Sequence, residues 1–271
     1  MILSPGSSFP AVGGVLAALA LGAYALAALP ALPRDRGHRV STALLLAGAL
    51  LHLGLLVVDI GGFGGSGGAR LGFAPVLSAT VWLVVALHAV ESRLVPLPSV
   101  RIGVSLAGAA AVLLTMLFPG EERRFGSPLG PLHFVLGITS YGVFGAAVLH
   151  ALLLDAAERR MKLRKAPPGM PGIPLLQLER LTFRFVGVGF AVLSATLILG
   201  VVSPVGWRWE HKTVFSLLAW LVFASLLGGR WLRGWRGRHA TRWVYAGAAL
   251  LLLAYVGSRF VVEVLLQRGG A

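Results

Sequence analysis

The chain contains no cysteine among its 271 residues. Without thiols it can form no disulfide, and it can supply neither a thiolate ligand nor a thiol redox centre of its own. Charged residues are also scarce, at 13% of the sequence, whereas an average soluble domain has about 25%. The absence of cysteine excludes thiol chemistry in this chain, and the low content of charged residues argues against a soluble protein.

Long apolar runs take the place of the missing charge, and 56% of the residues are hydrophobic. Runs of roughly 18 residues or more recur, and each can cross a hydrocarbon core of about 30 Å as a helix. They lack the period-2 alternation of barrel strands. We therefore predict an all-α polytopic integral membrane protein, a single transmembrane domain over residues 1–271, with about eight spans at 10–29, 40–60, 73–90, 100–118, 131–154, 181–202, 213–232 and 243–266.

The basic residues are distributed unevenly between the two sets of alternate loops. One set holds only seven of the 24 Lys and Arg residues: Arg70, Arg123, Arg124, Arg208, Lys212, Arg259 and Arg268. Because basic loops stay in the cytoplasm, we expect both termini outside, a basic cytoplasmic loop at 155–180 and an outer Trp-rich loop at 203–212. The net charge of +14 then reflects topology and anionic lipid, and no nucleic-acid partner is expected. No Lys or Arg precedes Pro10, so the first span is expected to be retained and not to be a cleaved signal peptide.

Two ionisable residues fall within the second span, His52 at mid-depth and Asp59 near its outer end. Their spacing of seven residues places them on one stripe of a helix. An ionisable group in a span is a candidate functional residue. A neutral His52 that is hydrogen-bonded to a neighbouring helix is the structural alternative, and the sequence leaves both open.

A polar, tryptophan-rich stretch separates the sixth and seventh spans. Indoles suit a flat aromatic ligand, an imidazole can ligate iron, and Lys or Arg can bind carboxylates. An outer aromatic belt with a snorkelling lysine is the alternative interpretation. His133, at the start of the fifth span, is expected at the same outer level. The candidate residues of the stretch are Trp207, Arg208, Trp209, Glu210, His211, Lys212 and Trp220.

This stretch resembles the signature of the cytochrome c assembly family, the heme-handling membrane proteins of the CcsA and CcmC type. The family pattern is roughly Trp-x-Trp-Asp-Pro-Lys-Glu with a later Trp, and here it falls on Trp207 to Thr213 and Trp220. The run from His133 to Tyr141 is similar to the family helix that carries an outward heme-ligating histidine. Tyr255, Gly257 and Phe260 resemble its last span. The chain is most similar to the HemX-like and YpjD-like branch.

The sequence departs from the family pattern at several positions. Glu210 stands in place of the aspartate, His211 in place of the proline and Thr213 in place of the glutamate. A second outward histidine is expected after the last span, where this chain has Leu265 to Gln267. The resemblance implies that His133 is an axial ligand of the heme iron. His211, or His52 within the membrane, would then replace the missing second histidine ligand.

The resemblance implies a heme-binding inner-membrane protein that takes part in cytochrome c assembly. The tryptophans would pack on the macrocycle, and Arg208, Lys212 or Arg259 would hold the propionates. No nucleophile with an adjacent base is present, so we expect a handling protein and not an enzyme. Because the chain has no thiol, it would need a thiol-redox partner and other assembly components.

Two other functions are compatible with the sequence. A HemX-like regulatory or scaffolding protein would keep the fold without stable heme ligation. A small-solute or proton carrier would use His52 and Asp59, but such carriers have an inverted repeat with interrupted helices, and the sequence lacks that symmetry.

Overall fold

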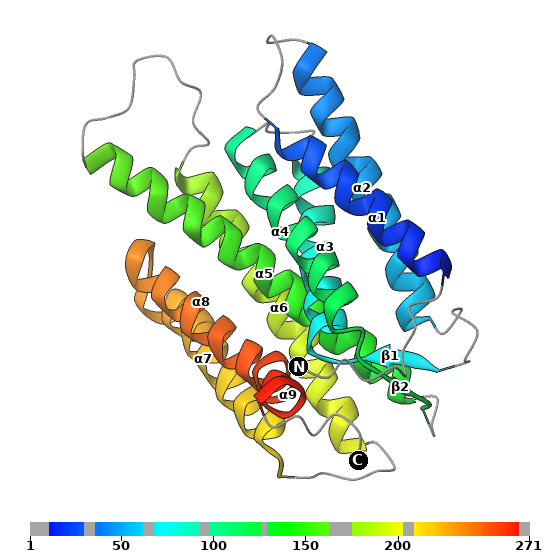
Figure 1. The fold of residues 1–271 in the computed structure, drawn as a ribbon. Helices are drawn as coiled ribbons and strands as arrows, with labels where there is room; N and C mark the ends of the chain where they lie inside the picture. Colours follow the sequence, from blue (N-terminus) through cyan, green and yellow to red (C-terminus); the bar gives the residue numbers. More distant parts are fainter. Residues whose placement is uncertain are drawn as a thin grey trace. The chain divides into compact units, whose positions relative to one another are not determined.

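The computed structural model describes residues 11–29, 36–61, 68–92, 98–125, 129–162, 175–202 and 209–265. Within these ranges the chain is almost entirely helical (Figure 1). The helices are α1 (Ala11–Ala28), α2 (Arg36–Ile60), α3 (Phe73–Glu91), α4 (Pro98–Leu117), α5 (Leu129–Lys162), α6 (Leu175–Val202), α7 (His211–Arg233), α8 (Gly237–Leu252) and α9 (Ser258–Phe260), with π-helical segments η1 (Leu253–Gly257) and η2 (Val261–Leu265).

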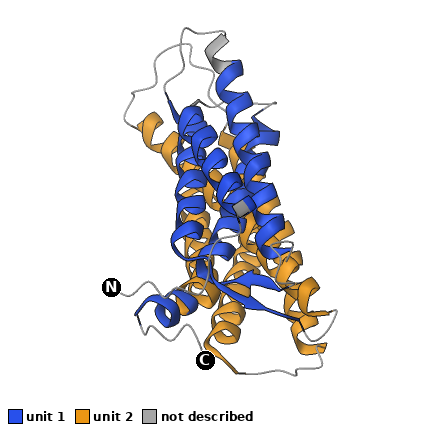
Figure 2. Cartoon of the chain, turned by 45° about the vertical axis from the view of Figure 1, so that its right-hand side comes forward, with its two compact units in different colours: residues 1–126, 259–271 blue, residues 127–258 orange. Residues whose placement is uncertain are grey.

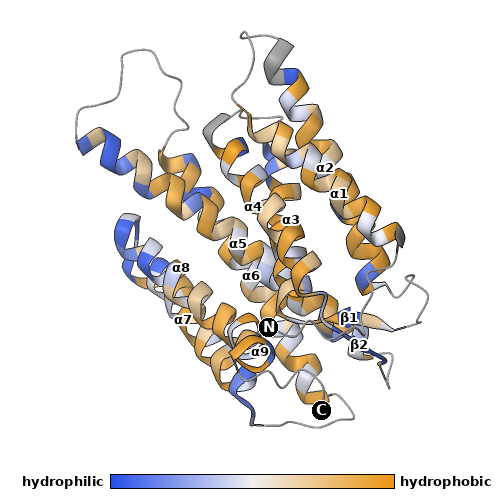
Figure 3. Cartoon of the chain, viewed as in Figure 1, coloured by the Kyte–Doolittle hydropathy of each residue, from blue (hydrophilic) through white to orange (hydrophobic). Residues whose placement is uncertain are grey.

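The predicted fold class, an all-α polytopic membrane protein with about eight spans, is confirmed. Among the described residues, seven helices are long and apolar enough to cross a membrane, and the shorter α1 is also apolar. Apolar residues fill the middle of these helices, whereas hydrophilic residues gather near their ends (Figure 3). The orientation with both termini outside stays a prediction.

The helices extend beyond several predicted spans. Helix α5 continues to Lys162 and α6 begins at Leu175, so the predicted loop at 155–180 is helical at both ends. Hydropathy detects the apolar part of a helix and misses its polar turns. The last turn of α5 carries Arg159, Arg160 and Lys162, which interact favourably with the negative end of the helix dipole.

The chain folds into two compact units (Figure 2). Unit 1 comprises residues 1–126 and 259–271, and unit 2 comprises residues 127–258. Unit 1 contains α1 to α4 and the end of the last span, while unit 2 contains α5 to α8 with η1. Each unit has its own buried core.

The core of unit 1 is built around Tyr24 of α1, whose side chain is fully buried. Its ring lies against two glycines: Cβ atoms added at Gly48 and Gly108 would both approach ring atoms to 2.8 Å. The Tyr24 hydroxyl shares a hydrogen bond of 3.2 Å with His52 Nδ1, and His52 Nε2 shares one of 2.7 Å with Ser78 Oγ. These two hydrogen bonds therefore connect α1, α2 and α3.

Two three-residue strands, which the sequence did not predict, pair at one end of unit 1. Strand β1 (Ala69–Leu71) is antiparallel to β2 (Glu121–Arg123), and Figure 1 shows them side by side. Between α4 and β2, Gly120 has a φ of 74°, and a Cβ there would lie 2.8 Å from the Leu71 carbonyl oxygen. The buried Arg70 lies 3.7 Å from the Glu122 carboxylate and interacts electrostatically with Asp59. These contacts hold the pair over the end of α2.

The core of unit 2 is a layered stack of glycines and aromatic rings. Phe144 of α5 and Phe223 of α7 stack at 3.8 Å between centroids with an interplanar angle of 11°. A Cβ atom at Gly189 of α6 would approach the Phe144 ring to 3.0 Å, and one at Gly247 of α8 would approach the Phe223 ring to 2.5 Å. Each ring thus packs against a glycine of a neighbouring helix.

Polar contacts join the helices at the opposite end of unit 2 from His133. Asp155 of α5 accepts hydrogen bonds from the hydroxyls of Thr241 (2.9 Å) and Tyr245 (3.0 Å) of α8. These two bonds fix α8 against α5.

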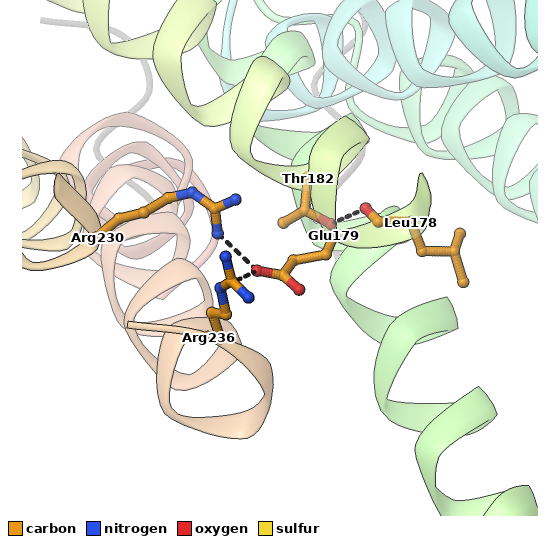
Figure 4. A network of polar contacts seen from close by, with 5 residues as sticks. All are labelled: Leu178, Glu179, Thr182, Arg230 and Arg236. Carbon is orange, nitrogen blue, oxygen red and sulfur yellow. Dashed lines mark hydrogen bonds and ion pairs between the residues drawn. The ribbon is translucent and has the colours of Figure 1, made fainter. Parts of the chain in front are cut away.

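A second polar contact at this end joins α6 to the last turn of α7 and to the turn that follows it (Figure 4). The Glu179 carboxylate lies 2.6 Å from Arg230 and 3.7 Å from Arg236. Arg230 also lies over the ring of Phe183, at 3.7 Å from its centroid. The guanidinium groups of Arg230 and Arg236 thus share the carboxylate of Glu179.

Candidate functional site

The first turns of α5 place His133 on the surface of unit 2. Its imidazole lies beside α6, because a Cβ added at Gly200 would be 3.3 Å from His133 Cε1. The ring also interacts with the main chain of Thr196, one turn before Gly200, and with the charge of Lys212. His133 is therefore held against α6 and lies near the start of α7.

The three other histidines of the spans differ in what their rings contact. Both nitrogens of His52 are used in hydrogen bonds within unit 1. His150 Nδ1 bonds the Ala146 carbonyl oxygen at 2.8 Å, and its ring packs on Phe185. His88 is buried on α3. An axial ligand needs one ring nitrogen for the metal, while the other often donates to a backbone carbonyl. Of the four histidines of the spans, His52, His88 and His150 are buried, whereas His133 is exposed.

The residues at the start of α7 form a short polar group beside the indole of Trp209. Glu210 precedes the helix, and the amides of Thr213 and Val214 donate to its carbonyl oxygen at 2.9 and 3.1 Å. The Lys212 ammonium lies 2.9 Å from the Glu210 carboxylate. Trp209 is 74% exposed.

Several predicted residues lie elsewhere. His211 is exposed and begins α7, so it and Lys212 belong to a helix and not to the predicted loop at 203–212. Trp207 and Arg208 lie outside the described residues. Trp220 is turned inward: its Nε1 donates to Ser194 Oγ at 2.8 Å. Its ring also packs on Phe190, at 5.3 Å between centroids.

An aromatic group that the sequence did not place lies behind His133. The ring centroid of its neighbour Phe134 is 6.4 Å from that of Tyr255. Tyr141 interacts electrostatically with Tyr255. Tyr255 belongs to η1, where the backbone is π-helical. Such wide turns occur often at functional sites. Hydrophobic periodicity gives no signal for a change from α-helix to π-helix, so the sequence could not predict it.

The last two predicted residues, Arg259 and His52, belong to unit 1. Arg259 interacts electrostatically with Glu263, whose carboxylate accepts a hydrogen bond of 3.4 Å from the Phe73 amide. The spacing of Arg259 and Glu263 predicts that they lie on one face of the helix. The bonding of His52 to Tyr24 and Ser78 agrees with the structural alternative, a histidine that joins neighbouring helices.

The donor set fits a heme better than a bare metal ion. Across the described ranges no group of three or more His, Asp or Glu side chains could hold an ion. A heme iron needs only axial ligands from the protein, and a histidine is a common one. The exposed His133, the exposed indole of Trp209 and the cation of Lys212 supply a ligand, a flat surface and a partner for carboxylates.

The fold and this group define a class, the helical membrane proteins that present an imidazole and an exposed tryptophan at one end of a group of helices. The family model described as cytochrome C assembly protein matches residues 12–266. The chain therefore belongs to the cytochrome c assembly protein family.

Three relatives illustrate the similarity. The inner membrane protein YpjD of Escherichia coli K12 is 34% identical over 137 residues, which cover 49% of this chain and 52% of YpjD. An uncharacterized 28.8 kDa protein of Azospirillum brasilense is 29% identical over 198 residues, 70% of this chain and 73% of that protein. The cytochrome c biogenesis protein CcsA of Synechococcus sp. CC9605 is 23% identical over 211 residues, 65% and 69% of the two chains. The matched region thus spans about half the length of YpjD, and no solved structure matches the chain.

Proposed function

We propose that this protein binds heme at the end of unit 2 that carries His133, and that it takes part in cytochrome c biogenesis in the inner membrane. One observation carries the proposal: the imidazole of His133 is exposed, and its ring lies against α6 beside Gly200. This contact orients the ring, and an exposed histidine can ligate a heme iron. The names of the YpjD and CcsA relatives support the membrane and the process.

Each neighbouring residue has a role that its position allows. Gly200 leaves room beside the His133 ring, because any side chain there would meet Cε1. Trp209, which is largely exposed, would pack on the macrocycle, and Trp207 is expected to do the same. Lys212, oriented by its ion pair with Glu210, would bind a propionate, with Arg208 as a further candidate. The same role for Arg259 stays a prediction.

The second axial position is proposed for His211, which is exposed at the first residue of α7. Heme supplies the iron that these residues would ligate, and the protein holds and orients it. Trp220, packed between α6 and α7, supports the start of α7 from inside. His52 is not included, since both of its ring nitrogens are bonded within unit 1.

We propose a handling role for the protein. The chain has no cysteine, so it cannot reduce or relay the thiols to which heme is attached in a cytochrome c. We propose that a separate thiol-redox partner and other assembly components perform that step. The heme site would then receive or present the cofactor.

The proposal predicts that heme content depends on His133. The protein purified from cells supplied with a heme precursor should give a pyridine hemochrome spectrum, and His133→Ala should lose at least about 80% of it, because a lost axial ligand weakens binding severalfold or more. The matched control is His239→Ala. His239 is also exposed in unit 2, but it lies on the Trp235 ring at the other end.

Heme content unchanged in His133→Ala, or reduced equally in both variants, would contradict the proposal. Equal loss would indicate a general effect of removing surface imidazoles. A wild-type protein without heme would favour the regulatory or scaffolding alternative.

A further inference from the structure

The first turns of α4 bury a cationic side chain for which the described residues supply no anionic partner. Arg101 is 5% exposed, and Ser105, one turn further along, is 0% exposed. Arg101 Nε and Ser105 Oγ are both buried, and neither atom has a hydrogen-bond partner in the part of the chain that the structure describes. None of the ion pairs in that part involves Arg101.

Two other charged groups in the described ranges have partners of opposite charge. Arg70 lies near Glu122 and Asp59, and Glu179 is paired with Arg230 and Arg236. Burying a charge without a partner is costly, and intramembrane cations usually pair or mark a binding site. Arg101 therefore points to a ligand that supplies the missing negative charge.

The backbone adds to the positive potential at this place. Helix α4 begins at Pro98 and is 20 residues long, so the positive end of its dipole lies next to Arg101. Arg101 and Ser105 are four residues apart and so share one face of the helix. A guanidinium and a hydroxyl on one face, beside a helix N-terminus, match the oxygens of a phosphate group.

The depth of the pair favours a lipid as the source of that phosphate. The apolar segment of α4 runs from Val100 to Leu117, so Arg101 lies at its edge, where head groups are found. Helix α4 packs against α1 and α3. His88, buried on α3, is three residues from the end of that helix, and Arg101 is three from the start of α4. Basic pockets between helices at this level bind anionic head groups.

We propose that Arg101 and Ser105 form a binding site for the phosphate of an anionic phospholipid. The site belongs to unit 1 and does not depend on heme. It holds a structural lipid at the end of α4, where the lipid phosphate neutralises Arg101 and accepts the hydrogen bond of Ser105.

The experiment uses the full chain, delipidated in a nonionic detergent, with thermal unfolding followed by tryptophan fluorescence. Short-chain phosphatidylglycerol is titrated in one arm and inorganic phosphate in the other. A ligand that binds the folded state raises the unfolding temperature as its concentration passes the dissociation constant. We expect a saturable rise with phosphatidylglycerol.

Three variants identify the site. Arg101→Gln should need at least about tenfold more lipid for the same rise, as expected for loss of a charge-assisted contact. Ser105→Ala should need roughly threefold more lipid than the wild type, because a hydrogen bond from a neutral hydroxyl is weaker than a charge-assisted contact. Arg238→Gln is the matched control, since it removes the same charge from an exposed position of α8. It should titrate like the wild type.

The lipid-free proteins provide a second measurement. Without its ligand, Arg101 is an unpaired buried charge, so Arg101→Gln should unfold at the same or a higher temperature than the wild type. If inorganic phosphate raises the unfolding temperature saturably and Arg101→Gln abolishes that rise, the result would support the phosphate site, with a free ion as the ligand. No saturable rise in either arm, or equal titrations of Arg101→Gln and Arg238→Gln, would overturn the proposal.

Discussion

Replacing Gly247 by alanine is expected to destabilise unit 2 by about 1–3 kcal/mol, the range measured for overpacked cores. The new Cβ would lie 2.5 Å from the Phe223 ring. That ring cannot move away easily, because its other face is stacked on Phe144 at 3.8 Å, and Phe144 in turn lies against Gly189. The added methyl must therefore separate α8 from α7. Unfolding of the purified protein in mixed micelles with increasing SDS, followed by tryptophan fluorescence, measures the change.

Gly228→Ala is the matched control for that variant. Gly228 lies within α7, and nothing is within 4 Å of a Cβ added there. Alanine is favoured over glycine inside a helix by about 1 kcal/mol, so this variant should be neutral or slightly more stable. If both variants shift the unfolding curve alike, the stacked arrangement of rings and glycines does not determine the stability of unit 2.

Replacing Tyr24 by alanine is expected to have a comparable or larger effect on unit 1, on the order of 3 kcal/mol. The ring is fully buried and fills the space between Gly48 of α2 and Gly108 of α4. Its removal leaves a void between three helices and also takes away the hydroxyl bonded to His52. In a membrane the loss is mainly one of packing, because lipid tails are as apolar as the core. The same SDS titration measures the effect.

Tyr24→Phe separates the two contributions. It keeps the ring and removes only the hydrogen bond to His52 Nδ1, for which interhelical bonds in membranes suggest a loss of about 0.6 kcal/mol. A loss in Tyr24→Phe as large as that in Tyr24→Ala would show that the polar chain, and not the packing of the ring, stabilises the contact of α1 with α2.

The sequence predicted the spans because apolar length and helical structure are linked directly in a membrane. The polar start of α6 before residue 181 was missed, since hydropathy does not detect the part of a helix that lies outside its apolar run. The pairing of Ala69–Leu71 with Glu121–Arg123 was also missed. It joins segments far apart in the chain, and three-residue strands give no periodic signal.

The candidate site was predictable only in part. A histidine at the outer end of a span and a nearby tryptophan-rich stretch are visible in the sequence. What each side chain contacts depends on the neighbouring helices. Trp220 faces Ser194 and Phe190, and His52 is bonded on both sides. The fit of aromatic rings to glycines on facing helices likewise follows from helix packing that residue spacing along one helix cannot specify.

The axial-ligand role of His133 is tested most directly by restoring the ligand from solution. In His133→Ala the side chain beside Gly200 is missing, and added imidazole can enter the space and bind iron in its place. We predict that His133→Ala loaded with hemin shows an altered Soret band, and that imidazole restores the wild-type spectrum. A spectrum that equals that of the wild type before any imidazole is added would contradict the central claim.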